Sequence, residues 1–149
     1  MDTIRPWLCI GNYRDTQKRS YLEFNSIQAI LQLAEPVKFS GIESLYLNVP
    51  DMTPISPDKL RQGVGFILEE KNKGNKILVA CMAGVNRSSA FCIAALKETE
   101  GLSLVDAFKA GKQKHPEAMP QEPVWESLSS YYDEPLSYLD IMRISAQYY

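Results

Sequence analysis

The chain has 149 residues, 45% of them apolar, and a formal net charge of −2 at pH 7. This length and apolar content predict one domain with one sizeable core. The charge balance, without any basic stripe, argues against nucleic-acid binding, and no apolar run approaches the ~18 residues of a membrane span.

Apolar runs bounded by turn residues predict strands near 7–10, 27–33, 43–49 and 76–80. Between them, apolar residues at helical spacing predict a helix after Ser56, with Ser56 as its N-cap and Pro57 at its first position. Ser103 marks a similar helix start. Strands that alternate with helices favour a layered α/β fold, with a central, mostly parallel sheet flanked by helices and a site at the carboxyl ends of the strands.

The segment that follows the fourth predicted strand contains the candidate catalytic and phosphate-binding residues. A continuous apolar run over 76–80 is followed by Cys81, and the residues 88–97 form a second apolar run that predicts a buried helix, so the chain must turn between them. Backbone N–H groups at a helix N-terminus form a nest for an anion such as phosphate. The predicted nest consists of Met82, Ala83, Gly84, Val85, Asn86 and Arg87.

Two side chains of this loop have predicted roles. Arg87 supplies a planar, permanently charged fork that can hold two phosphate oxygens. The same positive field favours the thiolate form of Cys81, which makes it a candidate nucleophile. The side chains of Met82 and Asn86 are not implicated. Cys9 and Cys92 lie in apolar runs and are predicted to be small buried hydrophobes.

Residues 81–88 resemble the signature of the cysteine-dependent protein tyrosine phosphatases, and of their dual-specificity branch in particular. The similarity extends over roughly residues 4–132. It includes 4–12, which is similar to the opening strand of the family, 49–55, which is similar to its general-acid loop, and 124–128, which is similar to its closing helix. The resemblance implies the cysteine-phosphatase fold, with a catalytic domain over 1–134 and a helical extension over 135–149 packed on or beside it.

Asp51 is the candidate general acid. It follows the strand near 43–49 in a loop bounded by prolines, thirty residues before Cys81, as the resemblance leads one to expect. Asp58 is the rival, although it suits the first turn of the helix after Ser56 better. The resemblance also implies that Ser88 stabilises Cys81 when it departs as a thiolate.

The implied function is phosphomonoester hydrolysis on phosphotyrosine and phosphoserine or phosphothreonine proteins, without metal or cofactor, through a phosphocysteine intermediate. One residue departs from the pattern: Ala80 stands where most members carry His. Two alternatives therefore stay open, a weak or inactive phosphate-binding pseudophosphatase and a rhodanese-like sulfurtransferase.

The single histidine, His115, leaves too few ligands for a binuclear metal centre and is predicted to lie at a solvated helix end, beside a surface cluster of Lys112 and Lys114. Three cysteines without a zinc spacing or a disulfide framework, and no basic-then-apolar signal pattern, predict a cytoplasmic protein.

A final helix is expected within 135–149. Four of its apolar residues should line one face that docks on the core or contacts a partner or a second copy: Leu136, Leu139, Met142 and Ile144.

Overall fold

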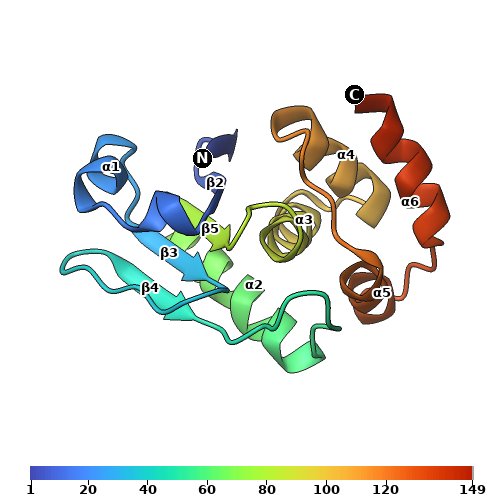
Figure 1. Cartoon of the computed structure of the whole chain (residues 1–149), viewed down its shortest axis with the longest axis horizontal. Coiled ribbons are helices and arrows are strands. Elements are labelled where there is room, and N and C mark those ends of the chain that lie inside the picture. The colour runs from blue at the N-terminus through green and yellow to red at the C-terminus, as the bar shows by residue number, and fades with distance from the viewer. Residues whose placement is uncertain (149) are drawn as a thin grey trace.

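The computed structural model describes residues 1–148, and Tyr149, the last residue of the expected extension, lies outside them. One sheet separates a small helical layer from a large one (Figure 1). The strands are β1 (Asp2–Arg5), β2 (Leu8–Asn12), β3 (Ala29–Gln32), β4 (Glu43–Tyr46) and β5 (Ile77–Cys81). The helices are α1 (Arg19–Phe24), α2 (Pro57–Asn72), α3 (Arg87–Glu100), α4 (Leu104–Lys114), α5 (Glu122–Tyr131) and α6 (Tyr138–Ser145), with short 3-10 helices at Tyr13–Thr16 and Ala146–Tyr148.

The strand order is β1-β2-β5-β3-β4, and every neighbouring pair is parallel except β1 with β2. All five residues of β5 are buried, which is the burial pattern of a strand covered on both faces. The predicted mostly parallel sheet flanked by helices is confirmed. The strands β3 and β4 are shorter than predicted, whereas β2 and β5 begin and end later than predicted.

The opening segment differs from the expectation of one strand. The chain turns at Pro6 and Trp7, so that Arg5 pairs with Leu8 and residues 2–12 form the hairpin of β1 and β2. Proline has no N–H and cannot continue a strand ladder, which is the physical reason for the break.

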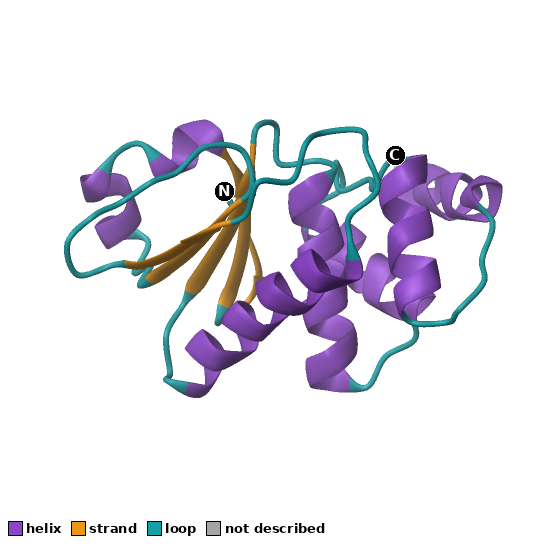
Figure 2. Ribbon diagram, turned by 90° about the horizontal axis from the view of Figure 1, so that it is seen from below, coloured by secondary structure: helices purple, strands orange, loops and turns teal. Residues whose placement is uncertain are grey.

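The alternation of side chains along β5 divides the core into two clusters. Ile77, Val79 and Cys81 face the larger cluster, which is completed by α2, α3, α4 and α5. Leu78 and Ala80 face the smaller one, together with Leu22 of α1. Cys81 therefore points toward the layer that contains α3, and Figure 2 shows most of the helices gathered on that side of the sheet.

Both predicted helix starts are confirmed, because the hydroxyls of Ser56 and Ser103 each accept a backbone N–H at the third helical residue. Cys9 and Cys92 are buried, as predicted.

The C-terminal helix α6 packs against α4 and α5, and of the four predicted residues Leu136 and Ile144 pack against the core, whereas the prediction is wrong for Leu139 and Met142. Ile141 is fully buried, whereas Leu139 and Met142 are more than half exposed. The helix begins after Ser137, its N-cap, and at 100° per residue neither Leu139 nor Met142 shares the inner face with Ile141. A partner or dimer contact through 135–149 stays a prediction. Within residues 1–148, no helix is long and apolar enough to cross a bilayer.

Candidate active site

The site forms where β5 ends and α3 begins. Cys81 is the last residue of β5, Arg87 is the first residue of α3, and residues 82–86 form the loop between them. Gly84 has φ of +74°, and a Cβ placed on it would lie 2.9 Å from the carbonyl oxygen of Gly11 in β2. Glycine is required here both for the backbone conformation and for the close approach to β2.

Two carbonyl groups of the loop 82–86 are bonded to backbone N–H groups outside the loop. The carbonyl of Met82 accepts the N–H of Tyr13 at 3.3 Å, and the carbonyl of Val85 accepts the N–H of Met119 at 2.9 Å. In a trans peptide the N–H points opposite to the C=O. With the carbonyls facing outward, the N–H groups of Ala83 and Asn86 face inward, which is the arrangement of an anion nest.

Cys81 and Ser88 meet at the base of this loop. The Sγ of Cys81 lies 3.2 Å from the Oγ of Ser88, and both residues are buried. A hydroxyl in this position can donate a hydrogen bond to a thiolate. Ser88 therefore stands where it can stabilise negative charge on the sulfur.

The guanidinium group of Arg87 is hydrogen-bonded through its Nη1, whereas its Nε has no hydrogen-bond partner among the described residues. Its Nη1 donates to the carbonyl oxygens of Leu33, at 3.0 Å, and of Val49, at 2.7 Å. Its Nε is buried and has no hydrogen-bond partner among the described residues, although the Oδ1 of Asp51 lies 3.4 Å away. A buried donor without a partner is costly, and an anion bound at the loop would satisfy it.

Asp51, in the loop 50–55, lies beside Asn86 and Arg87. Its Oδ1 accepts the side-chain N–H of Asn86 at 2.8 Å, and its side chain remains 54% exposed. Asp58, the rival acid, is in the first turn of α2, where its exposed carboxylate pairs with Arg61. Of the two, only Asp51 is brought to Arg87.

The interpretation that the Asn86 side chain plays no part is wrong. Its amide nitrogen holds Asp51, and its Oδ1 accepts the backbone N–H of Gln121 at 2.7 Å, at the N-terminus of α5. Asn86 thus connects the loop 82–86, the loop 50–55 and α5. Asparagine immediately before a helix suggests an N-cap, but this side chain makes no capping bond.

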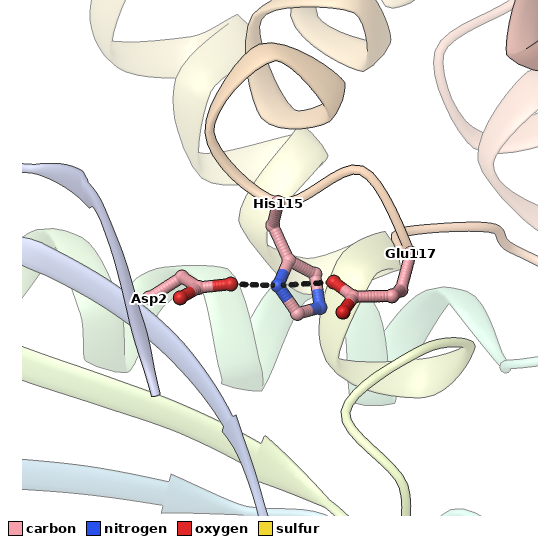
Figure 3. Close-up of side chains that lie close together, drawn as sticks. All are labelled: Asp2, His115 and Glu117. Carbon is pink, nitrogen blue, oxygen red and sulfur yellow. Dashed lines mark hydrogen bonds and ion pairs between the residues drawn. The ribbon is translucent and has the colours of Figure 1, made fainter. Parts of the chain in front are cut away.

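The prediction that His115 is solvated is also wrong, and so is the surface position of Lys112. His115 is 9% exposed, and its ring lies between Asp2 of β1 and the loop 82–86 (Figure 3). Lys112 is fully buried, and its ammonium group donates to the carbonyl of Pro116. Pro116 ends α4 at this point, and the last turn of the helix lies beside the loop 82–86, where His115 bonds to Gly84.

Known proteins resemble this chain over most of its length. The family model described as the catalytic domain of dual specificity phosphatases matches residues 8–134. The chain is 31% identical to human dual specificity protein phosphatase 2 over 116 residues, which cover 74% of this chain but 37% of that protein. The chain thus spans little more than a third of that relative's length.

Two solved structures resemble this one closely. Human DUSP28 superimposes with a TM-score of 0.83 at 25% identity, over 89% of this chain and 96% of that one. The human tyrosine phosphatase-like serine/threonine/tyrosine-interacting protein gives 0.80 at 26% identity, over 89% and 95%. These likenesses do not favour the sulfurtransferase alternative. From its catalytic-domain match and its fold, the chain belongs to the dual specificity phosphatase family.

Proposed function

We propose that this chain removes phosphate from phosphotyrosine and from phosphoserine or phosphothreonine in proteins, without a metal ion and through a phosphocysteine intermediate. The observation that carries the proposal is the buried, unpartnered Nε of Arg87 at the loop that holds Cys81. The inward N–H groups and this guanidinium nitrogen together offer donors to a phosphoryl group and leave the thiol beneath it.

In the first half-reaction the thiolate of Cys81 attacks phosphorus, an S–P bond forms, and the bond from phosphorus to the ester oxygen breaks. The departing oxygen takes a proton from Asp51, which the contact with Asn86 keeps at the mouth of the loop. A positioned carboxylic acid typically contributes about 10²–10⁴ in rate. Arg87 and the inward N–H groups stabilise the charge on the equatorial oxygens throughout.

In the second half-reaction water attacks the phosphocysteine. Asp51, now a carboxylate, takes a proton from the water, an O–P bond forms, and the S–P bond breaks to release inorganic phosphate. The sulfur departs as a thiolate, and the hydroxyl of Ser88, 3.2 Å from it, donates a hydrogen bond to the new charge. One carboxyl group therefore serves both steps.

The open mouth of the site supports a range of phosphorylated side chains. Asp51 and the neighbouring Met52 are both more than half exposed, and so is Met82 in the loop below. A site with an exposed acid can protonate the oxygen of a short serine or threonine as well as that of tyrosine. The proposal includes action in the cytoplasm, which the three free cysteines support.

A phosphate-binding protein without turnover is the second candidate. Ala80 before Cys81 favours it, and so does the likeness to a human protein described as phosphatase-like and interacting. Against it stand the contact of Cys81 with Ser88 and the position of Asp51 beside Arg87.

The deciding experiment is hydrolysis of para-nitrophenyl phosphate in EDTA, from acid to mildly alkaline pH, for the wild type and Cys81→Ser. We expect turnover in the wild type and none in the variant. If neither protein turns over while inorganic phosphate still binds, the phosphate-binding candidate replaces the enzyme. Turnover retained by Cys81→Ser would overturn the phosphocysteine mechanism.

A further inference from the structure

The carbonyl of Gly84, in the middle of the loop 82–86, is held by a side chain from another element. The carbonyl oxygens of Met82 and Val85 are bonded to backbone N–H groups, whereas that of Gly84 accepts the Nε2–H of His115 at 2.7 Å. His115 lies 31 residues further along the chain and caps the C-terminus of α4. The loop thus depends at its central peptide on a residue from another element.

His115 is itself fixed from the other side. Its Nδ1 lies 2.6 Å from the Oδ2 of Asp2 in β1 and 3.2 Å from the Oε2 of Glu117 (Figure 3). A backbone carbonyl only accepts hydrogen bonds, so the Nε2 of His115 donates to Gly84, while the contact of Nδ1 with Asp2 fixes the orientation of the ring.

The peptide that follows Gly84 is the one most in need of such a restraint. Glycine tolerates both left-handed and right-handed backbone conformations, so the peptide plane between Gly84 and Val85 can rotate at low cost. Rotation would turn the carbonyl of Gly84 toward the anion and remove the N–H of Val85 from it. The bond from His115 keeps the donor inward and the acceptor outward.

We infer that His115, oriented by Asp2, is a positioning residue that holds the loop 82–86 in its anion-binding form. The inference rests on the proposed function, because the loop is taken to bind the phosphoryl group of the substrate. His115 contacts the outside of the loop and not the substrate, so its removal weakens phosphate binding through the peptide of Gly84.

The test compares His115→Ala with His115→Gln. The alanine removes the donor, whereas the glutamine amide places an N–H where the Nε2 of histidine stands. We measure the Kd of inorganic phosphate by calorimetry, the KM and kcat of para-nitrophenyl phosphate, and the melting temperature. All buffers contain EDTA, because atoms of Asp2, His115 and Glu117 lie within 4.8 Å of one another and could otherwise hold an added cation.

We expect His115→Ala to raise both Kd and KM roughly tenfold, the effect of losing one hydrogen bond that holds the loop. His115→Gln should recover most of the loss, to within about threefold of the wild type, because its amide N–H replaces the donor to the carbonyl of Gly84. Glu117→Gln is the matched control: it touches the same ring nitrogen, is 64% exposed, and should leave Kd and KM unchanged.

The outcomes separate this inference from the proposed function. If His115→Ala binds phosphate as the wild type does, the inference is overturned and the enzyme proposal stands. If His115→Ala and His115→Gln lose phosphate affinity equally and their melting temperatures fall equally, His115 has only a structural role, and the inference is again overturned. If the wild type binds phosphate without turnover while His115→Ala binds it tenfold more weakly, the inference stands and the proposed phosphatase function is rejected. A wild type that neither binds phosphate nor turns over overturns both.

Discussion

The two loops that form the site are held in different ways. Three carbonyls of the loop 82–86 are bonded to Tyr13, His115 and Met119, which belong to three separate parts of the chain. The loop 50–55 is fixed at its two ends, where Arg87 binds the carbonyl of Val49 and Ser127 accepts the N–H of Ile55.

Between those ends, the contacts of the loop 50–55 with the rest of the site are few and exposed. Asp51 is bonded to Asn86 and faces the Nε of Arg87, and more than half of its side chain remains in water. The proposed phosphate site is therefore held by contacts with three other parts of the chain, whereas the proposed acid is held by a contact that competes with solvent. Binding and proton transfer should accordingly respond to different substitutions.

The largest effect is expected where the loop 82–86 meets β2. Gly84→Ala forces a Cβ to within 2.9 Å of the Gly11 carbonyl at a φ of +74°, so the loop must shift and several inward donors are displaced together. Since one such donor is worth about 10²–10³ in kcat, we expect turnover to fall by at least about 10³-fold and phosphate binding to be lost. Turnover and calorimetry measure the two effects.

Gly74→Ala is the matched control for that change. Gly74 has a similar φ of +82°, but nothing lies within 4 Å of the added methyl group. It should lose about 1 kcal/mol of stability from backbone strain and keep its activity. Comparable losses of activity in both variants would mean that strain alone, and not the contact with β2, accounts for the effect of Gly84→Ala.

The next effect falls on the other loop. Asp51→Asn removes the proton donor and leaves the loop 82–86 unchanged, so kcat on phosphopeptides should drop by about 10²-fold or more while the Kd of phosphate stays within a fewfold of the wild type. Asp58→Asn changes an exposed carboxylate of α2 and should behave as the wild type. An inactive Asp58→Asn beside an active Asp51→Asn would reverse the assignment of the acid.

A smaller effect is expected at the contact between the loops. Asn86→Ala releases Asp51 and leaves the N–H of Gln121 without its acceptor, so kcat should fall roughly tenfold, with a smaller change in phosphate affinity. Thr53→Ala, which removes a bond to Pro50 inside the loop 50–55, is the control. If Asn86→Ala weakens phosphate binding as much as it lowers kcat, the two loops are not separable in the way described.

The difference between the loops also explains what the sequence could predict. Cys81, Gly84, Arg87 and Ser88 belong to one strand–loop–helix segment, and local pattern was enough to place them next to one another. Asp51 was placed through its distance from Cys81 and the resemblance to a family. The relative positions of such residues follow from the order of consecutive strands, loops and helices, and the sequence pattern predicts that order well.

The supports of the site depend on contacts between distant parts of the chain, and local pattern misjudged them. Asp2 and His115 are 113 residues apart in the chain, and the basic residues beside His115 suggested a solvated helix end. The surface prediction for Lys112 is wrong for the same reason. The sequence does not indicate that its ammonium group donates to the carbonyl of Pro116. The one available signal was Pro116, which ends α4 immediately after the only histidine of the chain.

The smallest effect concerns backbone strain at Met52, whose Sδ lies 4.0 Å from the Nδ2 of Asn86. Met52 in the loop 50–55 has φ of +60°, a left-handed conformation that costs a non-glycine residue about 1–2 kcal/mol but that asparagine accepts more readily. Met52→Asn should therefore raise the free energy of unfolding by about 1 kcal/mol, measured by chemical denaturation.

Met82 supplies the comparison for that change within the other loop. It is exposed to a similar extent, and it is not among the residues with positive φ, so Met82→Asn should bring no gain in stability. Equal gains in the two variants would show that asparagine helps through solvation of an exposed position and not through relief of strain. A gain confined to Met52→Asn would show that the loop 50–55 stores strain at the residue next to the acid, whereas the loop 82–86 assigns its left-handed position to glycine.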